Sequence, residues 1–253
     1  YSSLSLSADS SVLATVQGSS TSHIWTSPLS NPAEAKHVTS GSNSDFDPQW
    51  TPDGKLVFER SPGNIYMVDS RTGNLQQLTT DATNRFPRVS PDGRFIVYVS
   101  NQSGIPNLWR MDIDGSNPKQ LTTGFSVEPS ISPDGKEVIY SVGVDASRIW
   151  KVGIDGGQPV QLTNKESRNA IFSPDGKQFI CTWWEQPNSQ PKIALVPAAG
   201  GDPVKIFDFY AGGFRWTPDG QSFLYYADKD NAPKIWSQPI DGGEPKKLTN
   251  FPN

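Results

Sequence analysis

The stretch that decides the fold is FPRVSPDGRFIVYV, residues 86–99. Phe86–Val89 has the length of a short strand, and the continuous apolar run Phe95–Val99 is typical of a strand covered on both faces. Between them, Ser90–Gly93 carries turn residues, because proline presets φ at about −65° and glycine accepts the left-handed conformation that closes a type I turn with a bulge. The stretch therefore predicts a β-hairpin.

Two further strands follow in the same unit. After a loop over 101–107, Leu108–Met111 has the pattern of a third strand and Lys119–Thr122 that of a fourth. The dipeptide Asp114-Gly115 between them is a tight hairpin signal. The unit therefore predicts a four-stranded antiparallel sheet.

The same turn recurs along the chain. A Ser/Thr-Pro-Asp-Gly tetrapeptide, or a remnant of it, places its aspartate at Asp9, Asp53, Asp92, Asp134, Asp175 and Asp219, with spacings of 44, 39, 42, 41 and 44 residues. A period of about 40–45 residues with four strands per unit is typical of a β-propeller. We therefore predict an all-β chain that forms one six-bladed propeller domain, with blades near residues 1–41, 42–81, 82–124, 125–165, 166–208 and 209–253.

Composition excludes several classes of partner. The formal charge is −4, the pI is about 5.2 and no basic stripe is present, so nucleic acid is not expected as a partner. The longest apolar run, Phe95–Val99, is far too short for a membrane span.

Cys181 is the single cysteine, so no internal disulfide is expected. Because the chain starts at Tyr1 and already has a strand pattern there, we expect it to be a fragment of a longer protein.

The repeated wording also resembles a known family. The units repeat, with variations, Ser/Thr-Pro-Asp-Gly, a following Ile/Val-x-Tyr/Phe strand, an Ile/Leu-Trp strand, Asp-Gly-Gly and Leu-Thr, a combination that resembles the TolB-type, WD-repeat-like six-bladed propellers. The first unit departs from it, since Ser7-Ala8-Asp9-Ser10 lacks both Pro and Gly. The wording of residues 1–9 is similar to the C-terminal propellers of bacterial serine/threonine kinases and winged-helix regulators.

That second resemblance implies a sensor or interaction domain in a larger bacterial signalling protein, with a kinase or DNA-binding domain in the part that precedes Tyr1. It implies a periplasmic or extracytoplasmic location as part of a membrane-anchored parent, with the cytoplasm as the alternative.

A search for catalytic chemistry is mostly negative. The chain has neither a Gly-x-Ser-x-Gly elbow nor a phosphate-binding Gly-x4-Gly-Lys-Ser/Thr loop. Its two histidines, His23 and His37, belong to one unit, whereas a metal on a propeller axis would take ligands from several blades. We therefore expect no metal and no cofactor, turn capping by the repeated aspartates, and a buried, inert thiol at Cys181.

Variable positions of the first strands are the best candidates for a ligand site. At one position the six units carry Ser5, Gln49, Arg88, Ser130, Ile171 and Arg215, and two residues earlier they carry Ser3, Asp47, Phe86, Glu128, Asn169 and Gly213. Radial symmetry would bring these residues to one channel mouth, where a polar ligand or a peptide end could bind. The candidate ligand residues are Asp47, Gln49, Arg88, Glu128, Asn169 and Arg215, with Trp184 and Tyr210 beside them. Polar residues would also line a water-filled channel that binds nothing.

Three functions remain open on these grounds. The first is a non-catalytic module that binds a protein, a peptide or a small polar ligand, with Arg88 and Arg215 offering planar guanidinium groups that suit a carboxylate. The second is a small-molecule enzyme of the lyase or lactonase type with an axial metal, for which Asp47, Glu128 and Asn169 would supply ligands. The third is a purely structural spacer.

Overall fold

The computed structural model describes residues 3–18, 21–28, 30–31, 34–229 and 232–248. The described chain divides into two compact units, one of residues 1–77 with 211–253 and the other of residues 78–210. The expected strand start at Tyr1 and the expected strand residue Thr249 lie outside the described residues. In the described parts no α-helix occurs, so no helix there could cross a membrane.

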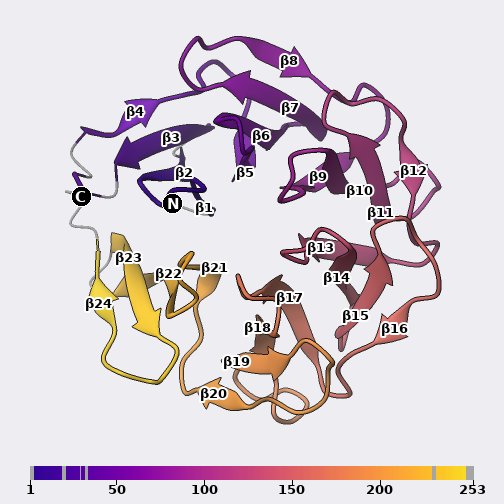
Figure 1. Ribbon diagram of the computed structural model, residues 1–253, viewed down its shortest axis with the longest axis vertical. Helices are drawn as coiled ribbons and strands as arrows, with labels where there is room; N and C mark the ends of the chain where they lie inside the picture. The colour runs from indigo at the N-terminus through magenta and orange to yellow at the C-terminus, as the bar shows by residue number, and fades with distance from the viewer. Residues whose placement is uncertain (1–2, 19–20, 29, 32–33, 230–231, 249–253) are drawn as a thin grey trace. The chain divides into compact units, whose positions relative to one another are not determined.

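Unit 1 holds three sheets of four consecutive antiparallel strands, which we call the first, second and sixth blades (Figure 1). The strands of the first blade are β1 (Leu4–Leu6), β2 (Val12–Gly18), β3 (Ser22–Pro28) and β4 (Lys36–His37). Those of the second are β5 (Asp45–Trp50), β6 (Lys55–Arg60), β7 (Asn64–Asp69) and β8 (Leu75–Gln77). Those of the sixth are β21 (Gly212–Trp216), β22 (Ser222–Lys229), β23 (Ala232–Pro239) and β24 (Lys246–Lys247).

Unit 2 holds the third, fourth and fifth blades in the same arrangement. The third consists of β9 (Asn84–Val89), β10 (Phe95–Ser100), β11 (Asn107–Asp112) and β12 (Lys119–Gln120). The fourth consists of β13 (Ser126–Ile131), β14 (Glu137–Val142), β15 (Arg148–Gly153) and β16 (Val160–Gln161). The fifth consists of β17 (Ser167–Phe172), β18 (Gln178–Trp183), β19 (Lys192–Pro197) and β20 (Lys205–Phe207).

The predicted fold class, all-β with six blades of four antiparallel strands, is confirmed in the described chain. The hairpin read from residues 86–99 is confirmed as β9 and β10, which pair in antiparallel register. That all blades belong to one domain stays a prediction.

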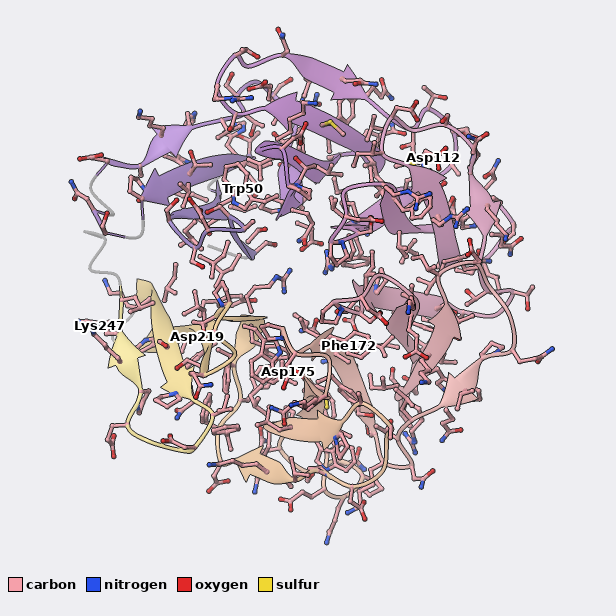
Figure 2. The ribbon with its side chains drawn as sticks, viewed as in Figure 1. Trp50, Asp112, Phe172, Asp175, Asp219 and Lys247 are labelled. Atoms are coloured by element: carbon pink, nitrogen blue, oxygen red, sulfur yellow. The ribbon has the colours of Figure 1, made fainter. Side chains whose placement is uncertain are left out.

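The repeated turn is built by hydrogen bonds within a few residues. In the third blade, Gly93 N donates to Ser90 O at 2.8 Å, and Ser90 Oγ donates to Asp92 Oδ1 at 2.6 Å. Phe95 N in turn donates to Ser90 Oγ at 2.9 Å. The glycine at the fourth position of the turn has positive φ, as the sequence predicted. The φ angles of Gly54, Gly93, Gly135, Gly176 and Gly220 are 83°, 70°, 72°, 69° and 66°. Figure 2 shows Asp175 and Asp219, the turn aspartates of the fifth and sixth blades.

The Leu-Thr dipeptides follow the fourth strands and do not form part of them, which corrects the sequence reading. β12 ends at Gln120, before Leu121-Thr122, and β16 ends before Leu162-Thr163. The threonine Oγ1 accepts the backbone N–H of the second residue of the third strand: Leu108 N lies 3.0 Å from Thr122 Oγ1, and Ile149 N lies 2.9 Å from Thr163 Oγ1. The hydroxyl thus replaces a ladder bond where the outer strand has already ended.

Apolar clusters join neighbouring blades inside each unit. In unit 2, Val97 of β10 packs with Val138 and Tyr140 of β14, and Ile139 of β14 packs with Trp183 and Cys181 of β18. In unit 1, Leu4 of β1 packs with Leu224 and Ile235 of the sixth blade, so the first and last blades pack against each other. Burial of apolar side chains between sheets is therefore the main source of stability.

The predicted burial of Cys181 is confirmed in the fifth blade. Cys181 is fully buried, and this burial raises the pKa of its thiol far above the ordinary value. Of the two adjacent tryptophans, Trp183 is 1% exposed in the core, whereas Trp184 is half-buried. Residues 182–183 belong to β18, so the loop that follows begins only at Trp184.

The turn aspartates predict how stability depends on pH. In Asp92, Asp134 and Asp175, the serine hydroxyl and then a backbone N–H hold the pKa of the carboxyl below its usual value, and in Asp9 the pKa falls to about 2. A lowered pKa in the folded state stabilises the fold above the unfolded pKa of about 3.9, and this contribution is lost as the pH falls through the folded values.

We therefore expect the free energy of unfolding to fall steadily from pH 5 to pH 2, with Asp92→Asn showing a smaller fall than wild type. Urea unfolding followed by circular dichroism at each pH measures both curves, and Asp202→Asn, at an exposed position outside the turns, is the control. A difference between wild type and Asp92→Asn that stays constant over this range would contradict the assignment.

Candidate functional site

The candidate site positions lie at a β-bulge in the first strand of five blades. The pairing register of the first strand with the second shifts within β5, β13, β17 and β21, and opposite Tyr98 in the third blade. At each bulge one residue adopts the left-handed conformation: Asp47, Phe86, Glu128, Asn169 and Gly213, with φ of 49°, 53°, 55°, 56° and 57°. The extra residue of such a bulge is left unpaired in the hydrogen-bond ladder, and its side chain points in a different direction from those of a regular strand.

Sequence reasoning selected these positions but missed the bulge. A usable signal was present, because Pro48, Pro87 and Pro129 each follow the left-handed residue directly. Proline has no N–H to donate to a ladder and is therefore found within sheets mainly at edges and bulges.

In unit 2 the bulges bring Glu128 and Asn169 together. Glu128 Oε2 accepts Ser141 Oγ at 2.8 Å and the backbone N–H of Asn169 at 2.9 Å. Ser130 Oγ accepts the N–H of Phe172, which Figure 2 labels, at 3.3 Å. The contacts with Asn169 and Phe172 run from the fourth blade to the fifth. The Glu128 carboxylate therefore couples two blades through one of its oxygens.

Unit 1 repeats this arrangement between its first and second blades. Ser3 Oγ donates to Asp47 Oδ1 at 3.0 Å, and Trp50 N donates to Ser5 Oγ at 3.2 Å. The Gln49 side chain donates from Nε2 to Pro48 O at 2.8 Å. Asp47 is therefore held against the neighbouring blade, as Glu128 is in unit 2.

The two candidate arginines have the same local geometry in different units. Arg88 Nη1 donates to Pro87 O at 2.8 Å, and Arg215 Nη1 donates to Phe214 O at 2.9 Å. Both side chains are half-buried. The contact with the preceding carbonyl orients each guanidinium group along its own first strand.

Of the two candidate aromatic residues, Trp184 follows β18 and Tyr210 follows β20, both in the fifth blade. The guanidinium carbon of Arg168 lies 5.1 Å from the centroid of the Trp184 ring, and Trp184 N donates to Glu166 O at 3.0 Å. Tyr210 is 55% exposed. That all eight predicted ligand residues meet at one mouth stays a prediction.

A pocket of about 220 Å³ lies between the third and fourth blades in unit 2. Its walls come from the segment before β9, from β9 and β10, from the loop before β11, and from β13, and Figure 1 shows these strands side by side. They are formed by Thr83, Arg85, Phe86, Val99, Asn101, Pro106 and Val127. Only Phe86 among them stood at a position that the sequence singled out.

Within the described residues, His, Cys, Asp and Glu side chains form no group of three or more that could hold a metal ion. The ring centroids of His23 and His37 are 5.7 Å apart, and His37 packs with its ring at 89° to that of Trp25. The histidine pair thus forms part of an aromatic cluster on the first blade.

Comparison with known proteins gives one family match. The model of the TolB beta propeller domain matches residues 3–170. An uncharacterized protein of Agrobacterium fabrum is 25% identical over 189 residues, which cover 70% of this chain and 52% of that protein. The chain therefore spans about half the length of this relative.

Solved structures agree on the fold. TolB from Acinetobacter baumannii superposes with a TM-score of 0.78 at 21% identity, over 94% of this chain and 63% of that one. An oligogalacturonate lyase from Vibrio parahaemolyticus superposes with a TM-score of 0.71 at 16% identity, over 98% and 76%. At these identities the likeness concerns the fold alone.

Proposed function

Because this chain belongs to the TolB β-propeller domain family, we propose that it is a non-catalytic module that binds a protein, a peptide or a small polar ligand. The binding residues are those around the first-strand bulges: Asp47, Gln49, Arg88, Glu128, Asn169 and Arg215, with Trp184 and Tyr210. As a part of a larger bacterial protein, it would act as a sensor or interaction domain.

The observation that carries the proposal is the set of left-handed bulge residues. A residue other than glycine costs roughly 1–3 kcal/mol in a sparsely populated backbone region, and such costs concentrate at binding sites. Four of the five bulge positions carry a residue with a side chain: Asp47, Phe86, Glu128 and Asn169. These side chains differ in charge and shape although the bulge itself recurs in five blades, so binding of a particular ligand would account for the choice of side chains rather than for the bulges.

Arg88 and Arg215 give the proposal its direct test. A screen with bacterial protein extract or a peptide library identifies a binder of wild type, whose affinity is then measured with Arg88→Ala, Arg215→Ala and the double variant. We expect the double variant to bind at least about tenfold more weakly, because hydrogen bonds to a charged group contribute roughly 1.5–3 kcal/mol. Arg71→Ala, which alters an exposed arginine of the second blade, is the control. A folded double variant that keeps full affinity would place the site elsewhere.

The enzymatic alternative makes a different prediction. The fold that this chain shares with a lyase keeps open a metal-dependent small-molecule enzyme, for which Asp47, Glu128 and Asn169 were the sequence candidates. One oxygen of Glu128 and one of Asp47 already accept hydrogen bonds within the fold. We therefore expect elemental analysis after incubation with Mn²⁺ and desalting to find well under one equivalent of metal. A retained stoichiometric equivalent would favour the enzyme.

A further inference from the structure

Phe86 is the anomalous member of the bulge series. Aspartate, asparagine and glycine tolerate the left-handed conformation, but a bulky aromatic residue with φ of 53° is a genuine outlier. Its ring is only half-buried and packs at the border of the cluster around Val97 and Tyr140. Core packing therefore compensates the backbone cost only in part. Phe86 also lines the 220 Å³ pocket.

Hydrogen bonds fix the other walls of this pocket in place. Thr83 N donates to Asn101 Oδ1 at 2.8 Å, and Asn101 N donates to Thr83 O at 3.2 Å. Ser126 N donates to Pro106 O at 3.0 Å, which attaches the loop before β11 to the start of β13. A pocket that is already formed costs little conformational entropy on binding.

The volume and the lining of the pocket indicate what kind of ligand it can bind. A cavity of about 150 Å³ lined by apolar side chains can hold benzene, whereas pockets for drug-sized molecules usually measure about 300–1,000 Å³. The pocket here lies between these values and is lined by Phe86, Val99, Pro106 and Val127. One six-membered ring fills such a space, and the Phe86 ring offers it an edge or a face.

Arg85 adds a charge to the same wall. It is exposed and already makes an interaction within the fold, but its guanidinium group carries five N–H donors and can bind a carboxylate in addition. A ligand that places a ring against Phe86 and a carboxylate near Arg85 would contact both residues favourably.

We propose that this pocket binds a single aromatic ring with a carboxylate close to it. The source is either a free aryl acid or an aromatic residue beside an acidic group in a peptide. The inference rests on the proposed binding function and names the chemistry of its ligand. It adds Phe86, Arg85, Thr83, Val99 and Val127 to the candidate binding residues.

The test is titration of ¹⁵N-labelled protein with phenylacetate, followed by the amide resonances of Phe86, Val99 and Val127. Cyclohexylacetate lacks the aromatic ring, phenylacetamide lacks the charge, and N-acetyl-Phe-Asp-amide represents the peptide source. We expect saturable shifts with phenylacetate below about 10 mM, and a dissociation constant at least about tenfold higher for both control compounds. Whichever of phenylacetate and the peptide has the lower dissociation constant shows whether the ligand is a free aryl acid or part of a peptide.

Variants assign the binding to the pocket. Phe86→Asn, which suits the left-handed conformation, and Arg85→Gln should each weaken phenylacetate binding about tenfold or more, while Arg71→Gln should leave it unchanged. If Phe86→Asn does not fold, Val127→Phe fills the pocket and should abolish binding. The inference is overturned if phenylacetate causes no shift at these residues, or if cyclohexylacetate binds equally well. If the Arg88→Ala, Arg215→Ala double variant weakens the binding of a partner and Phe86→Asn does not, the proposed binding function stands and the pocket is not part of the binding site.

Discussion

Replacing Asp45 by alanine is expected to lower the free energy of unfolding by about 3–5 kcal/mol, because it leaves a buried guanidinium group without its counter-charge. Asp45 is fully buried, and its two carboxylate oxygens accept Arg60 Nε at 2.6 Å and Nη2 at 3.0 Å. The contact raises the pKa of Arg60, whose guanidinium carbon also lies 5.3 Å from the Phe58 ring and 5.1 Å from the Tyr66 ring. Thermal unfolding should show a midpoint roughly 6–20 °C lower.

Two further variants separate the charge from the packing. Asp45→Leu combined with Arg60→Met removes both charges and should recover most of the lost stability, since apolar replacement of a buried pair is often neutral. Glu185→Ala breaks an exposed pair with Lys192 and should cost less than about 1 kcal/mol. A similar small effect for Asp45→Ala would show that Arg60 reaches water once its partner is gone.

Replacing Gly200 by valine is expected to cost about 2–5 kcal/mol, because a side chain there meets the backbone of the neighbouring blade. Gly200 has φ of 89°, and a Cβ on it would lie 2.5 Å from Leu162 O and 2.9 Å from Leu162 Cα. The next residue, Gly201, donates its N–H to the same carbonyl at 2.8 Å. Neither backbone can move without loss of this contact between the fourth and fifth blades.

Gly156 provides a matched control, since it occupies the corresponding hairpin of the fourth blade with φ of 87° and no atom within 4 Å of an added Cβ. Gly156→Val should therefore lose only the conformational contribution of about 1–2 kcal/mol. Chemical unfolding of both variants measures the difference, which is the cost of the contact between blades. Equal losses in the two variants would show that the hairpin of the fifth blade moves away without penalty.

The candidate site was only partly accessible to sequence reasoning. Glu128 and Asn169 were selected because they break the repeat, and the structure brings them within hydrogen-bonding distance. They were expected to bind a ligand or a metal, or to line a channel, yet Glu128 also couples two blades by accepting the backbone N–H of Asn169. The pocket beside Phe86 was not predicted, because its walls come from three strands and two connecting segments that have no common spacing in the sequence.

The sequence by itself determined the blade count and the turns, because both depend on local chemistry. A Ser-Pro-Asp-Gly turn is closed by bonds that span a few residues, such as Gly93 N to Ser90 O, so each copy carries its own conformation wherever it stands. The period of these turns then fixed the number of four-stranded sheets.

Only the tertiary structure decided which polar side chains meet. The left-handed conformation of Phe86 and Glu128 follows from a two-against-one pairing with the neighbouring strand, and the burial of Asp45 depends on Arg60 lying opposite it in β6. Such contacts depend on the register between strands and on the distance between blades. Both are set by the packing of side chains far apart in the chain, and no local pattern records them.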